Sequence, residues 1–257
     1  MTQEPMLLAL WCVPRSRSTA FERAMFERGD LLVLHEPFSR VCDFGEADVA
    51  GRRCTTQEEV MAALTDIASR EPVFFKDTTD FAFDAVTPDA AFLRRCRHAA
   101  MVRNPADTVR SHLRMQADAT SAAMGFGHLW DIVSAVTGAG LPMHLVDGDR
   151  VVGDPGTEMR RYCAAMDLTF LPESLSFRKE PPKSWGTTGS WHAGASDSSA
   201  LGAPPRAPGK LPDDLERTAL AHEQDQISPY TRILEALGGE NRSTRAETPA
   251  FPSQPIG

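Results

Sequence analysis

Five short apolar runs, separated by amphipathic segments, do most to limit the fold of this chain. The first, Met6–Val13, is apolar at nearly every position, which is typical of a central strand covered on both faces. The other four runs are Leu31–Leu34, Val73–Phe75, His98–Val102 and Met143–Val146. Strands that alternate with helices favour a parallel sheet wrapped by helices. We therefore predict an α/β fold with a parallel sheet of about five strands, flanked by helices on both faces.

Helical signals lie between and after these runs. Thr56 can cap a helix over Thr56–Ser69, whose apolar stripe follows it. The segment Ser121–Val136 has helical character that Gly125 and Gly127 weaken. The remaining predicted helices are Thr19–Arg28, Asp89–Arg97, Pro105–Met115, Pro155–Met166 and Asp213–Leu237.

The C-terminal third of the chain has a different composition. Residues 178–212 are rich in Pro, Gly, Ser and Ala with little periodicity, which indicates a long loop. Loops of that length are usually functional or disordered. The residues after 237 carry no core pattern. We expect one domain over residues 1–237, in which 178–212 form a flexible lid loop, followed by a loose tail at 238–257.

Charge and cysteine content exclude several classes of protein. The formal net charge of -8 argues against general nucleic-acid binding, which needs a basic surface. No apolar run approaches the length of a membrane span. Met6–Val13 is not preceded by the basic segment that comes before the apolar core of a signal peptide. Five scattered cysteines do not form the spacing of a disulfide framework or a zinc site. We expect a cytoplasmic protein that binds neither membranes nor nucleic acid.

A polar loop, Pro14-Arg15-Ser16-Arg17-Ser18-Thr19, joins the first predicted strand to the first predicted helix. The N-terminus of a helix presents unpaired N–H groups and partial positive charge, so it holds phosphate well. Two arginines add charge, and three hydroxyl groups add hydrogen-bond donors. The GxxxxGK[ST] pattern of nucleotide triphosphatases is absent. The loop therefore predicts an anion site, although a capped surface helix with two solvated arginines is the alternative.

A second candidate anion site follows the fourth predicted strand. Arg103 ends that strand, and Ser111 lies eight residues later, two turns into the next helix. Open α/β folds bind ligands at the carboxyl edge of the sheet, where both residues should lie. A salt bridge is the other interpretation of Arg103. Two anion sites on two strands predict a ligand that carries phosphate at both ends.

Together these motifs resemble the sulfotransferase family, whose donor is 3′-phosphoadenosine 5′-phosphosulfate (PAPS). PRSRST resembles the family's 5′-phosphosulfate loop, and RNPADTVRS resembles its 3′-phosphate motif. The resemblance extends over roughly Met6 to Ser199 and is greatest to bacterial small-molecule sulfotransferases. The N-terminal half is also similar to tyrosylprotein sulfotransferases. The resemblance implies a P-loop NTPase-like sheet, the product adenosine 3′,5′-bisphosphate, and no metal.

The resemblance also implies roles for individual residues. Arg15 would neutralise charge on the bridging oxygen and the transferring group, as a catalytic residue that also binds the donor. Glu36 resembles the base that deprotonates the acceptor hydroxyl, and Lys76 resembles a lysine that steadies the transition state. The residues implied to bind the donor are Arg15, Ser16, Arg17, Ser18 and Thr19 at the 5′ end, and Arg103 and Ser111 at the 3′-phosphate.

The chain departs from the family pattern at several positions. Arg17 stands where the family usually has a glycine or another small residue, and no histidine matches the base of the cytosolic animal enzymes. The sequence FFKDTTDF offers Asp77 and Asp80 there instead, and the C-terminal RKG motif is absent. His35 competes with Glu36 as the base. Because side chains alternate along a strand, we expect His35 and Glu36 to point to opposite sides, so that one of them faces the donor.

Acceptor contacts are predicted less directly. Trp191 and His192, in the predicted lid loop, could close over donor or acceptor. Core packing is an equal alternative for the aromatic residues after the second anion motif. The candidate acceptor residues are His35, Asp80, Phe126, His128, Trp130, Trp191 and His192.

The sequence thus favours a PAPS-dependent sulfotransferase that acts on a hydroxyl, or less readily an amine, of a soluble small molecule. Two alternatives stay open. One is a small-molecule kinase of the P-loop class, against which the missing GK[ST] counts. The other is a sulfotransferase-like binding protein without catalysis. Neither the acceptor nor the oligomeric state can be inferred from the sequence.

Overall fold

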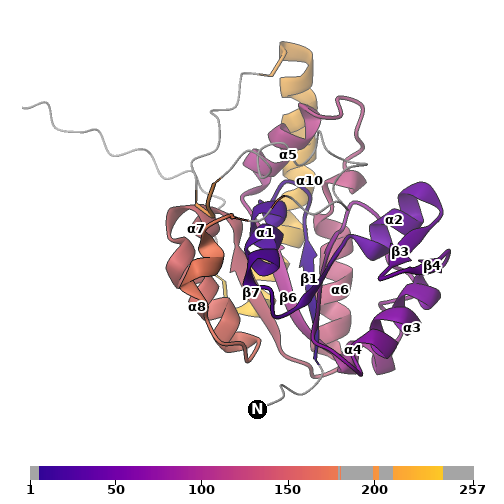
Figure 1. Cartoon of the computed structure of the whole chain (residues 1–257). Helices are drawn as coiled ribbons and strands as arrows, with labels where there is room; N and C mark the ends of the chain where they lie inside the picture. Colours follow the sequence, from indigo (N-terminus) through magenta and orange to yellow (C-terminus); the bar gives the residue numbers. More distant parts are fainter. Residues whose placement is uncertain (1–5, 179, 181–198, 203–210, 240–257) are drawn as a thin grey trace, which may run out of the picture.

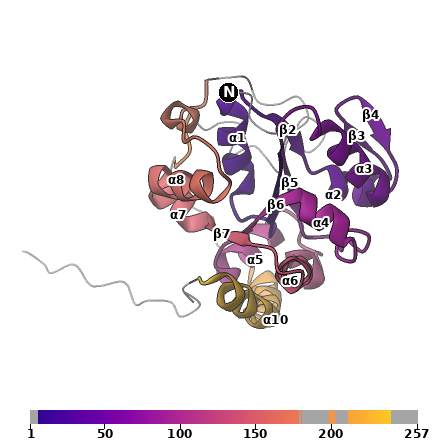
Figure 2. The ribbon, with the colours of Figure 1, turned by 90° about the horizontal axis from the view of Figure 1, so that it is seen from below.

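The structure is a computed structural model, and it describes residues 6–178, 180, 199–202 and 211–239. A five-stranded parallel sheet lies at its centre, with helices on both faces (Figures 1 and 2). The strands in spatial order are β2 (Leu32–His35), β5 (Val73–Thr78), β1 (Leu7–Cys12), β6 (Cys96–Val102) and β7 (Met143–Asp147). This arrangement confirms the predicted fold class and all five predicted strands.

Strand β1 occupies the middle of the sheet because both of its faces are apolar. Alternate side chains enter two separate cores: Leu7, Ala9 and Trp11 belong to one, and Leu8, Leu10 and Cys12 belong to the other. All six residues are buried. A strand with one polar face could not be covered by helices on both sides without burying unpaired polar groups.

Of the helices in the described ranges, three cover one face of the sheet. These are α1 (Ser18–Arg28), α7 (Gly148–Gly153) and α8 (Pro155–Ala165), with the 3-10 turn η2 (Pro172–Leu175) beside α1. In Figure 2 these three helices lie together on one side of the sheet. Phe21 and Tyr162 meet edge to face in this layer, with their ring centroids 4.8 Å apart.

The opposite face carries the larger core and most of the remaining helices. Trp11, Phe38 and Phe75 pack there with tilted or perpendicular rings. The helices on this face are α2 (Pro37–Phe44), α3 (Gln57–Ile67), α4 (Ala90–Arg95), α5 (Pro105–Leu113), α6 (Phe126–Gly138) and α10 (Asp213–Leu237). Helix α10 packs along α5 and α6, so the last described helix lies against two helices from the middle of the chain.

Three elements were not predicted. Helix α2 begins directly after β2, and α7 begins directly after β7. A two-stranded antiparallel hairpin, β3 (Ala47–Val49) and β4 (Arg52–Cys54), lies beside α2 and α3 on the side of the molecule opposite α7 and α8 (Figure 1). The hairpin is separate from the central sheet.

The segment Ser121–Val136 is helical but interrupted at Gly125, whereas Gly127 lies within α6. The 3-10 turn η1 (Ala122–Met124) ends at Gly125, and α6 begins at Phe126. Gly125 has φ 83, and a Cβ atom there would lie 2.6 Å from Cδ of Pro14. The glycine therefore lets this turn pack directly on the loop that follows β1.

Among the described residues no helix is both long and apolar enough to cross a membrane. The predicted lid, residues 178–212, falls mostly outside the described residues, as does nearly all of the predicted tail. The division of the chain into domain, lid and tail therefore stays a prediction.

Candidate active site

The direction of the strand connections reverses between β1 and β6. From β1 the chain goes to β2, at one edge of the sheet, and from β6 it goes to β7, at the other edge. We use the word crevice for the region beyond the carboxyl ends of β1 and β6. Ligands of open α/β sheets bind where the direction of strand connections reverses, beyond the carboxyl ends of the strands. The loop at Pro14–Thr19 follows β1, and Arg103 follows β6. Both predicted anion motifs therefore flank the same crevice.

The loop after β1 has an unusual backbone. Arg15 and Arg17 both have positive φ, at 63° and 75°, a conformation that costs residues other than glycine free energy. Arg17 is the N-cap of α1 and makes no side-chain capping hydrogen bond. Ser16, between them, is fully buried, and its Oγ has no hydrogen-bond partner among the described residues. Such strain and an unsatisfied hydroxyl group are features of a loop shaped for a ligand.

A hydrogen bond joins the two anion motifs. Nε of Arg15 donates to Oγ of Ser111 in α5, over 3.0 Å. The Arg15 side chain therefore crosses from the loop after β1 to the helix after β6. Burial, and then the charge of Arg103, lower the pKa of Arg15. The same two causes lower the pKa of Arg17. Arg103 is thus close enough to repel both Arg15 and Arg17, and an anion bound between them would relieve this repulsion.

Arg17 extends toward the second motif. Its Nε lies 3.7 Å from Oδ1 of Asp149, at the start of α7. Nε of Arg103 donates to the same oxygen over 2.8 Å, and Arg103 also pairs with Asp107 at 3.1 Å. Asp149 therefore holds two of the three arginines in place. Gly148 permits this contact, because a Cβ atom there would lie 2.2 Å from the carbonyl oxygen of Ser16.

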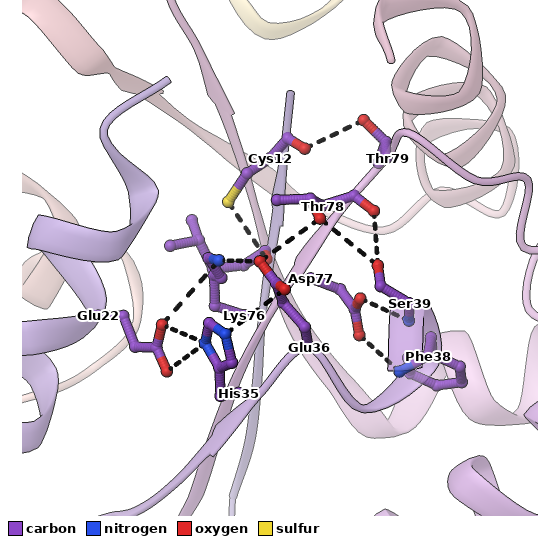
Figure 3. Close-up of polar contacts among 11 residues, drawn as sticks. Cys12, Glu22, His35, Glu36, Phe38, Ser39, Lys76, Asp77, Thr78 and Thr79 are labelled. Carbon is purple, nitrogen blue, oxygen red and sulfur yellow. Dashed lines mark hydrogen bonds and ion pairs between the residues drawn. The ribbon is translucent and has the colours of Figure 1, made fainter. Parts of the chain in front are cut away.

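An acid–base cluster lies beside this crevice, where β2 and β5 end. Nζ of Lys76, on β5, donates a short hydrogen bond to Oε1 of Glu36 and lies 4.0 Å from Oε2 of Glu22 on α1. Oγ1 of Thr78 also donates to Glu36, over 3.4 Å. Figure 3 shows Glu22, His35, Glu36 and Lys76 pointing toward one another. Burial alone would lower the pKa of Lys76, but the charges of Glu36 and Glu22 outweigh it and raise that pKa.

His35 and Glu36 face the same cluster, so the expectation that they point to opposite sides is wrong. Nε2 of His35 lies 3.5 Å from Oε2 of Glu36. Strand β2 ends at His35, and Glu36 has φ 50, in the left-handed region. The alternation of side chains holds only while the backbone stays extended. The turn at Glu36 brings its carboxylate back to the side of His35.

Two aspartates follow Lys76 and differ in their surroundings. The carboxylate of Asp77 accepts hydrogen bonds from the backbone N–H groups of Phe38 and Ser39, so it fixes the start of α2. Burial raises its pKa to about 7, although these bonds oppose the rise. Burial, followed by the charge of Glu36, raises the pKa of Asp80 to about 7 as well. The charge of Glu36 thus acts on both aspartates, and Asp77 also has a structural role at the start of α2.

The family follows from a comparison with known proteins. A family model described as a sulfotransferase domain matches residues 6–227 of the chain. The chain belongs to the sulfotransferase family. This confirms the family that the two anion motifs had indicated. Among the residues that the structure describes, no group of three or more His, Cys, Asp or Glu side chains is placed to hold a metal ion.

Two curated proteins of Arabidopsis thaliana are similar to this chain. Branched-chain-amino-acid aminotransferase-like protein 1 is 23% identical over 228 residues, which cover 84% of this chain and 40% of that protein. Branched-chain-amino-acid aminotransferase-like protein 2 is 22% identical over 257 residues, which cover 96% of this chain and 44% of that protein. The chain therefore spans less than half the length of these relatives.

Two solved structures are also similar. One is the sulfotransferase domain from the curacin biosynthetic pathway, with a TM-score of 0.49 and 14% identity over 93% of this chain and 99% of that one. The other is the sulfotransferase domain from the Synechococcus PCC 7002 olefin synthase, with a TM-score of 0.44 and 14% identity over 86% of this chain and 98% of that one.

The candidate acceptor residues of this sulfotransferase lie in different places. Phe126 is fully buried and packs edge to face on Tyr230, in the core. His128 hydrogen-bonds through Nδ1 to the backbone carbonyl of Thr79, over 3.0 Å, near the end of β5. Trp130 lies farther along α6, under the guanidinium group of Arg232. Trp191 and His192 lie outside the described residues. His35 is the candidate that contacts Glu36, and the charge of Glu36 contributes to the raised pKa of Asp80.

Sequence reasoning missed three residues of the site. Glu22 looked like an ordinary polar position of the first helix, although it lies one turn after Ser18 and therefore on the same side of the helix as that residue. Asp149 and Gly148 belong to the unpredicted helix α7. Asp147, the last residue of β7, could have indicated α7 from the sequence. Its side chain caps that helix by accepting from the N–H groups of Asp149 and Arg150.

Proposed function

We propose that this sulfotransferase moves a sulfuryl group from PAPS to a hydroxyl group, or less readily an amine, of a small-molecule acceptor. One observation carries the proposal. Arg15, Arg17 and Arg103 converge from two strand ends, with Arg15 bonded to Ser111 across the crevice. A nucleotide with phosphate groups at its 5′ and 3′ positions would neutralise both ends of this arginine group. Its sulfuryl group would extend toward Glu36 and Lys76.

Donor binding would use the loop after β1 and the motif after β6. The hydroxyl and N–H groups at the start of α1 suit the 5′-phosphosulfate, because helix N-termini bind anions. Arg103 and Ser111 suit the 3′-phosphate. Asp149 contacts both Arg17 and Arg103 and so connects the loop after β1 with the 3′-phosphate motif. The donor-binding residues in this proposal are Arg15, Ser16, Arg17, Ser18, Thr19, Arg103 and Ser111.

Transfer would occur in one in-line step. The acceptor oxygen forms a bond to sulfur while the bond from sulfur to the bridging phosphate oxygen breaks, and adenosine 3′,5′-bisphosphate leaves with the electron pair. Arg15 and Lys76 neutralise the charge that develops on the bridging oxygen and the sulfuryl group. Glu36 accepts the proton of the acceptor hydroxyl as the new bond forms. A sulfuryl group carries less charge than a phosphoryl group, so arginine and lysine can suffice without magnesium.

A mass-spectrometric transfer assay tests this function. The protein would be incubated with PAPS and a panel of phenols, alcohols and amines, and each compound would be checked for the mass of an added SO₃ group. We expect transfer by the wild type and none by Glu36→Gln, while both bind adenosine 3′,5′-bisphosphate in calorimetry. Glu46→Gln, an exposed carboxylate that pairs with Arg53 in the hairpin, is the control and should transfer normally.

The outcomes separate the alternatives. Binding of the bisphosphate without transfer to any acceptor would support a non-catalytic binding protein. Stabilisation by ADP with magnesium in place of the bisphosphate would support a kinase. Full activity of Glu36→Gln would refute the assignment of Glu36 as the base.

A further inference from the structure

Glu22 and His35 form a buried carboxylate–imidazole pair behind Glu36. The two carboxylate oxygens of Glu22 lie 2.8 and 3.0 Å from Nδ1 of His35. Both side chains are 1% exposed, so water does not compete for these contacts. A carboxylate can only accept hydrogen bonds, so Nδ1 carries the hydrogen atom. Helix α1 thereby fixes both the orientation of the His35 ring and its tautomer.

The other ring nitrogen of His35 faces the proposed base. In a neutral imidazole with hydrogen on Nδ1, Nε2 has a free electron pair. That nitrogen lies 3.5 Å from Oε2 of Glu36, a distance that can shorten when a ligand closes the site. Glu36 is the more open of the two carboxylates, with 16% of its side chain exposed against 1% for Glu22. His35 therefore lies between an open carboxylate and a buried one.

Two carboxylates flank the imidazole of His35. Glu22 and Glu36 each contribute a negative charge, and Lys76, whose pKa the two carboxylates raise, contributes a positive charge. Among the described residues, the other titratable groups whose charges act on this cluster are Asp77, Asp80 and the thiol of Cys12. A proton on Nε2 of His35 would place an imidazolium between the carboxylates of Glu22, at 2.8 Å, and Glu36, at 3.5 Å, and opposite charges this close attract each other.

We propose that His35 and Glu22 are positioning residues that act through Glu36 and receive the proton it takes from the acceptor. This inference rests on the proposed sulfuryl transfer. The acceptor hydroxyl gives its proton to Glu36 as the new sulfur–oxygen bond forms and the bisphosphate leaves. The proton then moves to Nε2 of His35, and Glu36 becomes a carboxylate again. The resulting imidazolium keeps its Nδ1–H bond to Glu22, and after product release the proton returns to water through Glu36.

This role differs from that of a base competing with Glu36. His35 is too buried to meet an acceptor directly, since its side chain is 1% exposed. A purely structural pair would also hold β2 against α1, but it would not affect proton uptake. The proton affinity of His35 is therefore the property to measure.

Nuclear magnetic resonance of the histidine rings tests the inference without an acceptor. The His35 signals would be assigned by their loss in His35→Gln and followed against pH in protein saturated with adenosine 3′,5′-bisphosphate. We expect hydrogen on Nδ1 in alkaline solution and a protonation midpoint that falls by about 1 pH unit or more in Glu22→Gln. The matched control is Glu27→Gln, which removes another carboxylate of α1 whose partner is Arg23, and it should leave the midpoint unchanged.

Kinetics provide the second readout. With PAPS and a phenol that the transfer assay identifies, Glu22→Gln and His35→Gln should lower kcat about tenfold or more. Bisphosphate affinity should stay within about twofold of the wild type, so a loss in kcat cannot be ascribed to misfolding. The acid limb of the pH–rate profile should move to lower pH in Glu22→Gln. The reason is that the cluster then takes up a proton from solution less readily, and a cluster that already holds this proton cannot accept the one from the acceptor.

The outcomes distinguish this inference from the function on which it rests. Hydrogen on Nε2, or an unchanged midpoint and acid limb in Glu22→Gln, would overturn the role of the pair while transfer by the wild type upheld the function. Failure of the wild type to bind the bisphosphate would overturn both.

Discussion

Removal of the Lys76 cation should expose how strongly the active-site cluster depends on its charge balance. The whole lysine side chain is buried, and its ammonium group lies between the carboxylates of Glu36 and Glu22. In Lys76→Met the apolar stem is largely kept, so the packing of β5 changes little. What is lost is the positive charge that lies within 4.0 Å of both carboxylates.

The expected loss of stability is large for one substitution. Breaking a buried ion pair by removing one partner costs about 3–5 kcal/mol, because the remaining charge stays buried without compensation. For a domain of this size each kcal/mol lowers Tm by roughly 2–4 °C, so the expected drop is roughly 6–20 °C. Urea denaturation at about pH 8, where carboxyl groups are ionised, measures the difference directly.

Two further measurements distinguish charge from packing. The double variant Lys76→Met with Glu36→Gln should recover about 1 kcal/mol or more relative to Lys76→Met, because it removes one of the uncompensated charges. The deficit of Lys76→Met should also shrink at about pH 5, where carboxyl groups take up protons more readily. A stability of Lys76→Met within about 1 kcal/mol of the wild type at both pH values would refute the reasoning.

Three other changes test separate parts of the site. The pKa of Asp80 is raised to about 7, so between about pH 4 and pH 7 the folded state holds a proton that the unfolded chain has released. The free energy of unfolding therefore falls as the pH rises through this range. In Asp80→Asn the free energy of unfolding, measured by urea denaturation, should depend less on pH in this range and should be higher than in the wild type above about pH 7. An unchanged slope would contradict this. Arg17→Gly relieves a left-handed backbone at φ 75, so stability should hold or rise by about 1 kcal/mol. Calorimetry should nevertheless show roughly tenfold weaker binding of adenosine 3′,5′-bisphosphate, and equal affinity would remove Arg17 from the donor site. Gly148→Ala places a Cβ atom 2.2 Å from the backbone oxygen of Ser16 and should weaken bisphosphate binding at least about tenfold, whereas Gly153→Ala, with nothing within 4 Å, should not.

Elements with strong local signals could be predicted from the sequence. The apolar run before the donor loop is β1, at the centre of the sheet, and the helix capped by Thr56 begins at the next residue, where the Thr56 side chain accepts from the N–H of Glu59. The long C-terminal helix has the predicted bounds, Asp213–Leu237, despite Pro229 within it. In each case the hydrophobic pattern of the segment agrees with the element that forms, and for the helix after Thr56 the capping residue agrees as well.

The two helices that the sequence did not predict, α2 and α7, are short and depend on tertiary contacts. Helix α2 has Pro37 at its first turn and Gly45 in left-handed conformation at its end, which are recognisable signals, but it depends on Asp77 of β5 to cap it. That carboxylate is 39 residues away in sequence from the Phe38 N–H that it accepts. Helix α7 has only six residues and two glycines, so propensity alone would not select it.

The sequence placed the two anion motifs at the same edge of the sheet, because each follows a strand of a parallel sheet. It paired Ser111 with Arg103 and did not anticipate the hydrogen bond from Arg15 to Ser111 that joins the two motifs. The roles of these residues in donor binding stay a prediction. The relation of His35 to Glu36 could not be inferred, because it depends on one left-handed residue at the end of β2. Glu22 enters the cluster through the packing of α1 against β2, which no local pattern encodes.

Binding of adenosine 3′,5′-bisphosphate tests the central claim most directly. Thermal denaturation would be followed with this nucleotide, with AMP, which lacks the 3′-phosphate, and with ADP plus magnesium. We expect the bisphosphate at about 100 times its Kd to stabilise the protein by about 2.7 kcal/mol, and AMP to bind at least about tenfold more weakly because Arg103 and Ser111 lose their ligand. Stabilisation by ADP with magnesium and none by the bisphosphate would contradict the account.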